Sequence, residues 1–213
     1  MNSNLRIKLV EIASKRISKN DPSHDFSHAL RVLSTAEKIA NKEGADLDIV
    51  VPAALFHDLV VYPKNHPDSM KSQYESAEAT GKILSNIPDY PVKKIDRVKT
   101  CIIECSFTKD VVHEMLESQI VQDADGLEAT GAISIMRTFA TTGQMNRPFY
   151  NPVDPFCKTR EPDAMKNALD LFYERLLRVT ERIHTKTAKK ISTRRTAFLR
   201  KFLTELDLEL KGK

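Results

Sequence analysis

Two adjacent residues, His57 and Asp58, lie within the otherwise apolar stretch AALFHDLVV, and both side chains are costly to bury. Apolar residues recur at helical spacing from about residue 46, so the stretch predicts a helix that buries one face together with this pair. A buried imidazole or carboxylate is usually hydrogen-bonded, ion-paired or bound to a metal ion, because an unpartnered charge is very unfavourable in an apolar environment. We therefore expect other segments to supply partners for the pair.

Candidate partners stand on two other predicted helices. His24 and His28 lie four residues apart in SHDFSHALRV, so they share a helix face. Asp125 lies in the polar stretch QDADG, at the start of a predicted long helix. If these helices pack together, two imidazole nitrogens and two carboxylate oxygens can bind one divalent ion through His28, His57, Asp58 and Asp125. Such ligation without cysteine favours Mn, Fe, Co, Ni, Mg or Zn in an open site, where free positions can hold water and a substrate oxygen for hydrolysis.

Each of these residues also has a purely structural interpretation. His28 can be a hydrogen-bonded helix histidine, Asp125 a helix N-cap and Asp58 a polar residue at a helix end. The chain carries no compact H-E-x-x-H pair, so spacing alone leaves the metal site and the structural interpretation both open.

Composition bounds the class of protein. The 213 residues, 41% hydrophobic and 29% charged, are typical of one folded, soluble domain. The longest uncharged apolar stretches are too short to span a membrane, and no apolar signal core follows the N-terminus, so we expect a cytoplasmic protein without a membrane partner. Three cysteines without metal-binding spacing argue against a disulfide framework or structural zinc, and Cys101 and Cys105 are expected to be buried as small apolar residues. The net charge of +4 is too small by itself to indicate nucleic-acid binding.

Helical periodicity recurs along the chain without long strand-like alternation, so an all-α fold is predicted. The expected helices span about 4–19, 24–43, 46 to the prolines near 63, 69–85, 91–105, 110–116, 120–141, 163–183 and 185–208. Between them, residues 142–162 form a loop rich in Pro, Asn and Asp that also carries aromatic residues. Such a loop can be a lid or an ordered surface connection.

The C-terminal segment is strongly basic. Between Arg175 and Lys201 there are ten lysines or arginines and one acid, Glu181. We favour two amphipathic helices with solvated outer faces, because no interleaved aromatic residues or base-reading motif accompany the charge. The alternative is contact with a phosphate backbone, or attraction of a small phosphorylated substrate.

The order of H, HD and D on successive helices resembles the HD superfamily of metal-dependent phosphohydrolases. The likeness is closer still to small stand-alone bacterial HD proteins of the YedJ type. The matching stretches are SHDFSHALRV, AALFHDLVVYPKNHP, IVQDADGLEATGAISIMRTFA, DPF at 154–156 and ALDLFYERLLRV. The resemblance implies one all-α HD domain over residues 1–213, a helical bundle with a metal-site core at about 22–141 and C-terminal helices at about 163–208 packed on it.

The resemblance also implies roles for individual residues. His28, His57, Asp58 and Asp125 would bind one divalent ion. The residues expected to take part in catalysis are His24, Asp58, Lys64 and Arg31.

Three of these expected roles concern the phosphate. His24 would contact it or donate a proton, Lys64 would meet it, and Arg31 would do likewise or hold a metal ligand. The structural alternatives are a helix N-terminal histidine, a solvated lysine and a surface ion pair. Asp123 and Glu128 could accept hydrogen bonds from the ligands, or could be capping or solvent-exposed residues.

The chain departs from the pattern of these relatives at several positions. They commonly carry histidines where this sequence has Thr100, Cys105 and Leu171, and arginine where it has Gly126. The thinner polar shell bears on substrate preference and argues against a two-metal phosphodiesterase site.

The expected function is a hydrolase that cleaves a phosphate ester, such as a nucleotide, with a metal-activated water. The first rival is a regulatory protein that binds metal and nucleotide without turnover. The second is a nucleic-acid-binding helical module that uses the basic C-terminal helices.

Overall fold

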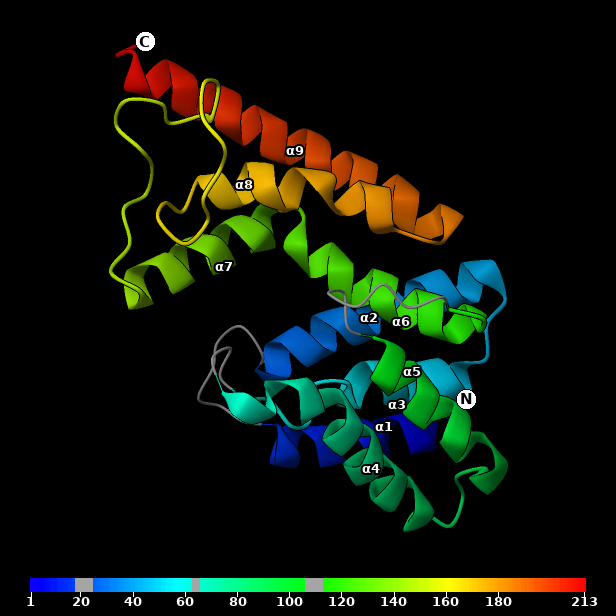
Figure 1. The fold of residues 1–213 in the computed structure, drawn as a ribbon. Helices are drawn as coiled ribbons and strands as arrows, with labels where there is room; N and C mark the ends of the chain where they lie inside the picture. Colours follow the sequence, from blue (N-terminus) through cyan, green and yellow to red (C-terminus); the bar gives the residue numbers. More distant parts are fainter. Residues whose placement is uncertain (18–24, 63–65, 106–112) are drawn as a thin grey trace. The chain divides into compact units, whose positions relative to one another are not determined.

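A computed structural model describes residues 1–17, 25–62, 66–105 and 113–213 (Figure 1). Within these ranges every regular element is a helix, which confirms the predicted all-α class. The chain divides into two compact units, Met1–Asp125 and Gly126–Lys213. The arrangement of the C-terminal helices on the metal-site core stays a prediction, and so does their membership of one domain. None of the described helices combines the length and the apolar character needed to cross a lipid bilayer.

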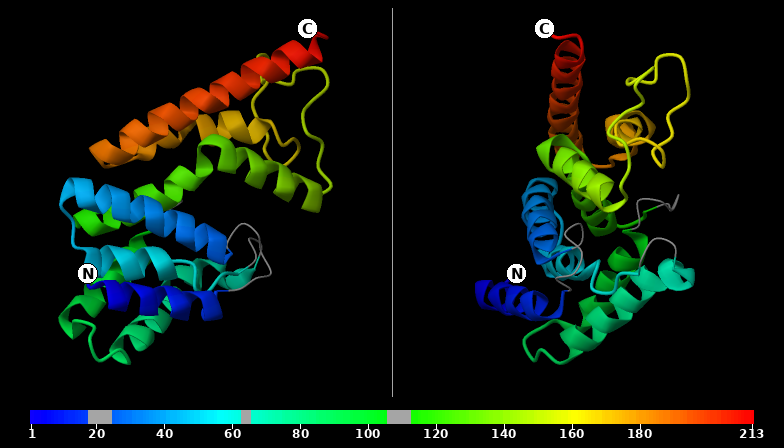
Figure 2. Two further views of the ribbon diagram at one scale, coloured as in Figure 1. Left: turned by 180° about the vertical axis from the view of Figure 1, so that it is seen from behind. Right: turned by 90° about the vertical axis from the view of Figure 1, so that its left-hand side faces the viewer.

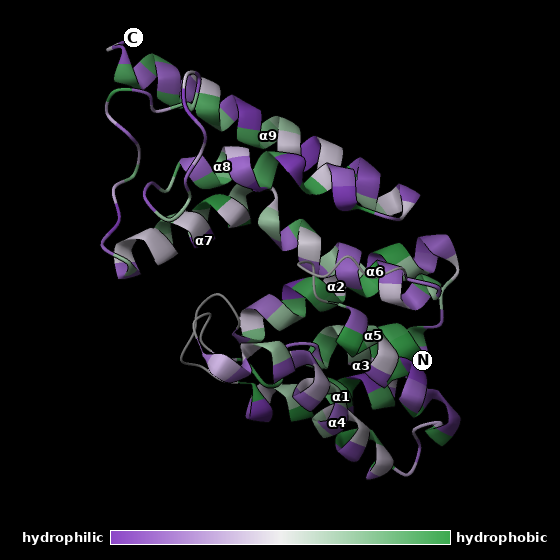
Figure 3. Ribbon diagram, in the orientation of Figure 1, coloured by the Kyte–Doolittle hydropathy of each residue, from purple (hydrophilic) through white to green (hydrophobic). Residues whose placement is uncertain are grey.

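The first unit is built around a buried central helix, α3. Its helices are α1 (Ser3–Arg16), α2 (Phe26–Glu43), α3 (Leu47–Phe56), α4 (Ser72–Ser85), α5 (Ile95–Glu104) and α6 (Leu116–Gly126), with 3-10 turns at Pro67–Lys71 and Val92–Lys94. Every residue of α3 from Ile49 to Phe56 is buried, and the helix packs against α1, α2, α4 and α5. Its apolar character is visible in Figure 3. Because α3 ends directly before His57, the most buried helix of the unit delivers the histidine and aspartate pair.

Local capping sets the ends of α2 and α3. The Asp25 carboxylate accepts a hydrogen bond from the backbone N–H of His28 at 2.8 Å, and Gly44 ends α2 with a left-handed φ of 79°. Asp46 caps α3 by accepting from the N–H of Asp48 at 2.9 Å. α2 ends at Glu43 as predicted but begins two residues after the predicted start, and α3 begins at Leu47 with Asp46 as its N-cap. The predicted extension of this helix to the prolines near 63 is wrong, because α3 ends at Phe56 and residues 57–60 form a turn and a bend.

The second unit packs three α-helices and short 3-10 segments around an apolar core. It contains the 3-10 turn η3 (Leu127–Ala129), α7 (Gly131–Gln144), α8 (Asp170–Glu174), the 3-10 helix η4 (Leu176–Arg182) and α9 (Lys186–Leu210). Figure 2 shows α9 as one long helix from both directions. The core residues are Leu169, Phe172, Leu176, Leu199 and Leu203. The Phe172 and Phe202 rings stack at 5.7 Å, joining α8 to α9.

The prediction of one helix over residues 120–141 is wrong. α6 begins earlier, at Leu116, and ends at Gly126, and α7 starts only after Thr130, whose φ of −131° and ψ of 151° are extended. Gly131 follows with a φ of 73°, a left-handed conformation that costs residues with a side chain about 1–2 kcal/mol. The apolar spacing continues across the break, so periodicity alone could not locate it.

Two further predicted helices are corrected. Residues 163–169 form turns rather than helix, and α8 begins at Asp170 because its buried carboxylate accepts a hydrogen bond from the backbone N–H of Asp163 at 2.7 Å. Residues 113–115 are also not helical, so the predicted helix over 110–116 is wrong there, while 110–112 lie outside the described residues. α1 ends at Arg16, before the predicted 19, because Ile17 is extended.

The loop after α7 is ordered by its own polar side chains. Asp154 accepts hydrogen bonds from the backbone N–H groups of Lys158 and Thr159 at 2.9 and 2.8 Å. Arg160 binds the buried carboxylate of Asp170 with both terminal nitrogens, at 2.5 and 2.7 Å. The stretches around Asp154 and Asp170, which belong to the family resemblance, therefore stabilise the second unit.

Candidate metal centre

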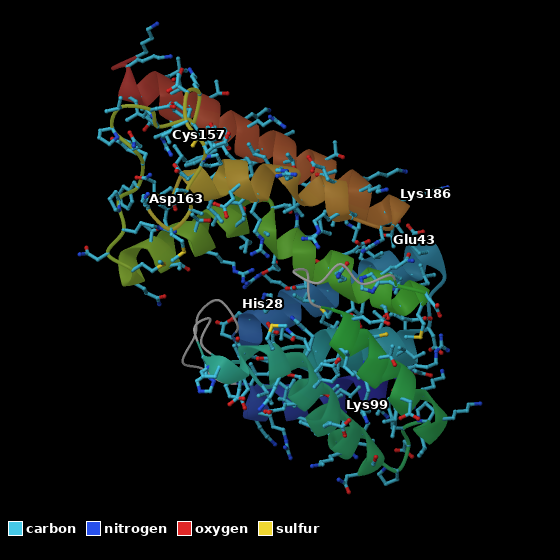
Figure 4. The ribbon with its side chains drawn as sticks, in the orientation of Figure 1. His28, Glu43, Lys99, Cys157, Asp163 and Lys186 are labelled. Carbon is cyan, nitrogen blue, oxygen red and sulfur yellow. The ribbon has the colours of Figure 1, made fainter. Side chains whose placement is uncertain are left out.

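Side chains from α2, α6 and the end of α3 converge on one point of the first unit, which Figure 4 marks by His28. His28 Nε2 and His57 Nε2 are 3.3 Å apart. Asp58 Oδ2 lies 3.6 Å from His28 Nε2 and 3.4 Å from His57 Nε2. Asp125 Oδ1 lies 3.5 and 3.8 Å from the same two nitrogens. All four residues proposed as metal ligands from the sequence are thus brought together.

These distances fit a shared cation. With bonds of about 2.1 Å, neighbouring ligand atoms around an octahedral ion are about 3.0 Å apart and opposite ones about 4.2 Å. All five distances fall between these limits. Ligand atoms of His28, His57 and Asp125 lie within 4.8 Å of one another, so these three form a candidate metal-binding group, beside which Asp58 contacts both imidazoles. The two nitrogen and two oxygen donors suit a borderline or hard divalent ion.

The orientation of His57 supports the same conclusion. Its Nδ1 lies 2.9 Å from the carbonyl oxygen of Ala54, which accepts a hydrogen bond from it. This bond turns Nε2 towards the cluster, as in metal-binding histidines whose second nitrogen is held by a carbonyl. Burial lowers the pKa of His57, but the carboxylates of Asp58 and Asp125 outweigh it and raise the pKa to about 9. The cluster thus stabilises positive charge where a metal ion would bind.

Burial distinguishes the nitrogen from the oxygen donors. The side chains of His28 and His57 are 1% and 3% exposed, whereas those of Asp58 and Asp125 are 24% and 27% exposed. The imidazoles therefore close the inner side of the cluster, and the carboxylates leave an outer side accessible to water and to a ligand.

The roles predicted for His24, Lys64 and Arg31 beside the four cluster residues are not tested by the structure. His24 and Lys64 lie outside the described residues, so their roles stay predictions. Arg31 is half-buried on α2, three residues after His28, and its role also stays a prediction. Asp123 and Glu128 are 0% and 3% exposed, which removes the solvent-exposed interpretation of both.

The positions that depart from the family pattern have structural explanations in three cases. Thr100 donates a hydrogen bond to the Asp96 carbonyl of its own helix, and Leu171 packs against the core of the second unit. Cys105 is buried, as predicted, and burial together with the nearby carboxylates raises its pKa well above the ordinary value. Its thiol therefore behaves as an apolar group.

Supporting residues of the cluster were missed by sequence reasoning. Asp25 caps α2 and so positions the first turn of the helix, which carries His28. An aspartate three residues before the histidine was the sequence signal that could have revealed this cap. Ser76 holds the segment after Asp58, because its hydroxyl accepts from the N–H of Val60 at 3.0 Å and lies 3.3 Å from the carbonyl of the same residue. The carbonyl of Ala54 has no side-chain signature that a sequence could show.

Comparison with known proteins agrees with the resemblance of the sequence to the HD superfamily. The family model described as HD domain matches residues 25–130. Uncharacterized protein YpgQ of Bacillus subtilis is 30% identical over 202 residues, covering 92% of this chain and 89% of YpgQ. The crystal structure of YpgQ in complex with ADP is similar with a TM-score of 0.73 at 27% identity, covering 97% of this chain and 95% of that one. A crystal structure of an HD-superfamily hydrolase from Bacillus thuringiensis also has a TM-score of 0.73, at 26% identity, covering 99% and 98%.

Proposed function

This chain belongs to the HD domain family, and we propose that it is a metal-dependent phosphohydrolase that cleaves a phosphate ester, with nucleotides as the substrate class. The observation that carries the proposal is the convergence of two buried imidazole nitrogens and two partly exposed carboxylate oxygens, which lie 3.3–3.8 Å apart in the five contacts described above. The ADP bound to YpgQ supports the choice of nucleotides.

The residues of the cluster divide the work of holding the ion. His28 and His57 supply nitrogen donors from the buried side, and the Ala54 carbonyl fixes the ring of His57. Asp58 and Asp125 supply the negative charge from the accessible side. A divalent ion bound there would polarise a phosphoryl oxygen and lower the pKa of a water molecule towards about 7. His24, Lys64 and Arg31 are proposed to neutralise the phosphate or assist the leaving group.

Elemental analysis of purified protein, followed by a phosphate-release screen, tests the proposal. The variant is Asp125→Ala, and the matched control is Asp96→Ala, which removes an exposed carboxylate on α5. Wild type and control, supplied with Mn²⁺, Co²⁺, Ni²⁺ or Mg²⁺, should bind about one ion per chain and release phosphate from a nucleotide. Asp125→Ala should lose most of the metal and the activity, because one of the two carboxylates that offset the ion's charge is gone.

Three outcomes would overturn parts of the proposal. Wild-type protein without metal and without activity on nucleotides and sugar phosphates would remove the hydrolase. Full metal content in Asp125→Ala would remove Asp125 from the site. Metal and nucleotide binding without phosphate release under every ion would replace the hydrolase with a regulatory binding protein.

A further inference from the structure

One face of α9 carries six cationic side chains. We define the α9 basic face by Lys186, Lys189, Lys190, Arg194, Arg200 and Lys201, all of which are exposed. At about 100° per residue these positions fall within a sector of about 140°, and they span about 22 Å along the helix. Lys186, at the start of the face, is labelled in Figure 4. The face is therefore a stripe of positive charge on one side of the helix, with four cations from Lys186 to Arg194 and two at Arg200 and Lys201.

The segment that carries the face has no acidic residue of its own, and the acids nearest to it in the sequence are Glu181 and Glu205. The sequence contains no Asp or Glu from Arg182 to Thr204. Among the described residues, none of the six cations forms an ion pair, although Arg178, Lys211 and others elsewhere in the unit do. A row of like charges that is not neutralised within the fold raises the local concentration of anions and favours a polyanionic ligand.

The opposite face of α9 holds the helix in place. Ala188, Ser192, Thr196, Leu199 and Leu203 are buried. The Thr180 hydroxyl of η4 lies 2.5 Å from the Ser192 hydroxyl and 3.2 Å from that of Thr196, which fixes the helix rotation. Because these inward residues are occupied within the unit, the helix cannot turn an apolar face into a lipid surface.

We infer that the α9 basic face binds the phosphate backbone of a double-stranded nucleic acid without reading its sequence. A duplex carries one negative charge per about 1.7 Å of axis, so about thirteen charges lie along the 22 Å of the face. All six positions are Lys or Arg, whose charged groups bind phosphate oxygens, and contacts to phosphate carry no information about base sequence. Phe198 is the one exposed aromatic residue of α9 and lies at the edge of the face, so the face lacks the series of stacking platforms that single strands require. This inference is independent of the proposed hydrolase activity.

Fluorescence anisotropy with a labelled 20-base-pair DNA duplex tests the inference. Each neutralised phosphate contributes about −0.9 to the slope of log affinity against log salt concentration, so six contacts predict a slope of about −5. The affinity should then fall roughly a thousandfold between 50 and 200 mM salt. Lys190→Glu/Arg194→Glu should make the slope less steep by about 2. Lys190→Gln/Arg194→Gln should do the same, because either pair removes two phosphate contacts.

The matched control is Lys38→Glu/Lys42→Glu on α2, two exposed lysines with the same spacing. It changes the net charge as much as the Glu variant of α9 does, and it should keep the wild-type slope. Circular dichroism checks that all variants are folded. The inference fails if wild type does not bind the duplex at 50 mM salt, or if the α2 control weakens binding as much as the α9 variants. It also fails if the protein binds phosphatidylserine vesicles but no duplex.

Discussion

Two glycines of α7 should respond to the same substitution with opposite signs. Gly131 begins the helix with a φ of 73°, and a Cβ built on it lies 3.1 Å from Arg195 Cγ and 3.3 Å from Arg195 Cβ. Gly143, near the other end, has no atom within 4 Å of such a Cβ and no positive φ. Gly131→Ala should therefore destabilise the protein, and Gly143→Ala should stabilise it.

The magnitude for Gly131→Ala follows from two costs. The left-handed backbone costs about 1–2 kcal/mol for alanine. The new methyl group must also displace Arg195, whose Nη1 donates a hydrogen bond to the Leu127 carbonyl at 2.8 Å, and a hydrogen bond of a charged group contributes about 1.5–3 kcal/mol. Partial relaxation of the arginine leaves a total of about 2–4 kcal/mol. Gly143→Ala should gain about 0.5–1 kcal/mol, since glycine is a poor helix former.

Thermal unfolding followed by circular dichroism at 222 nm measures both effects. For a chain of this length, a change of 1 kcal/mol in the free energy of unfolding shifts Tm by about 2–4 °C. Gly131→Ala should therefore lower Tm by roughly 4–16 °C, and Gly143→Ala should raise it by roughly 1–4 °C. In an Arg195→Ala background, Gly131→Ala should retain the backbone cost and the contact with the remaining Cβ at 3.3 Å, so the double-mutant cycle isolates the contribution of the arginine beyond its Cβ. A Tm for Gly131→Ala at or above that of wild type would refute the reasoning. A decrease in Tm for Gly143→Ala that is larger than the decrease for Gly131→Ala would also refute it.

Two further predictions concern a buried carboxylate and a helix cap. Burial raises the pKa of Asp170, but hydrogen bonds from Arg160, the Asp163 N–H and Asn167 outweigh it and hold the pKa below the ordinary value. This stabilisation is present above the unfolded pKa of about 3.9 and is lost as pH falls through the lower folded value. The urea midpoint of wild type should therefore drop in this acid range. Asp170→Asn should be less stable than wild type at pH 7 and should lack the part of the drop that Asp170 causes. Equal pH profiles of the two proteins would contradict a lowered pKa of Asp170. Asp25→Ala and Thr185→Ala each remove a helix cap, and each should lower the free energy of unfolding by about 1 kcal/mol. Only Asp25→Ala should also weaken Mn²⁺ binding measured by calorimetry, because Asp25 positions His28. An equal effect of both variants on Mn²⁺ binding would show that Asp25 does not position His28.

The sequence predicted the helical class and the composition of the candidate site for physical reasons. Helical apolar spacing is a local signal, and an imidazole and a carboxylate in an apolar run require partners wherever the chain supplies them. The polar stretch around Asp125 made it a candidate partner but also allowed an N-cap, and the family resemblance implied that it is a metal ligand. The structure places it inside α6, with its carboxylate beside both histidines.

What the sequence did not predict depends on contacts between distant residues. At the break before α7 the backbone of Gly131 is left-handed, and Arg195 of α9 donates a hydrogen bond to the carbonyl of Leu127, while the apolar pattern continues unchanged. The turns over 163–169 form because Asp170 accepts hydrogen bonds from the preceding loop, including Arg160 ten residues earlier. In both places tertiary contacts outweigh helix propensity.

The exposed carboxylates and the buried imidazoles of the cluster would affect two different properties of metal binding, the rate of binding and the preference among metals. A divalent ion entering from solvent would meet the oxygen atoms of Asp58 and Asp125 first, because their side chains are the exposed ones. It would contact His28 and His57 only after losing water, and imidazole nitrogens favour Zn, Cu, Fe and Ni, whereas carboxylates favour Mg, Ca and Mn. Capture rate and metal preference should therefore respond to different substitutions in the same cluster.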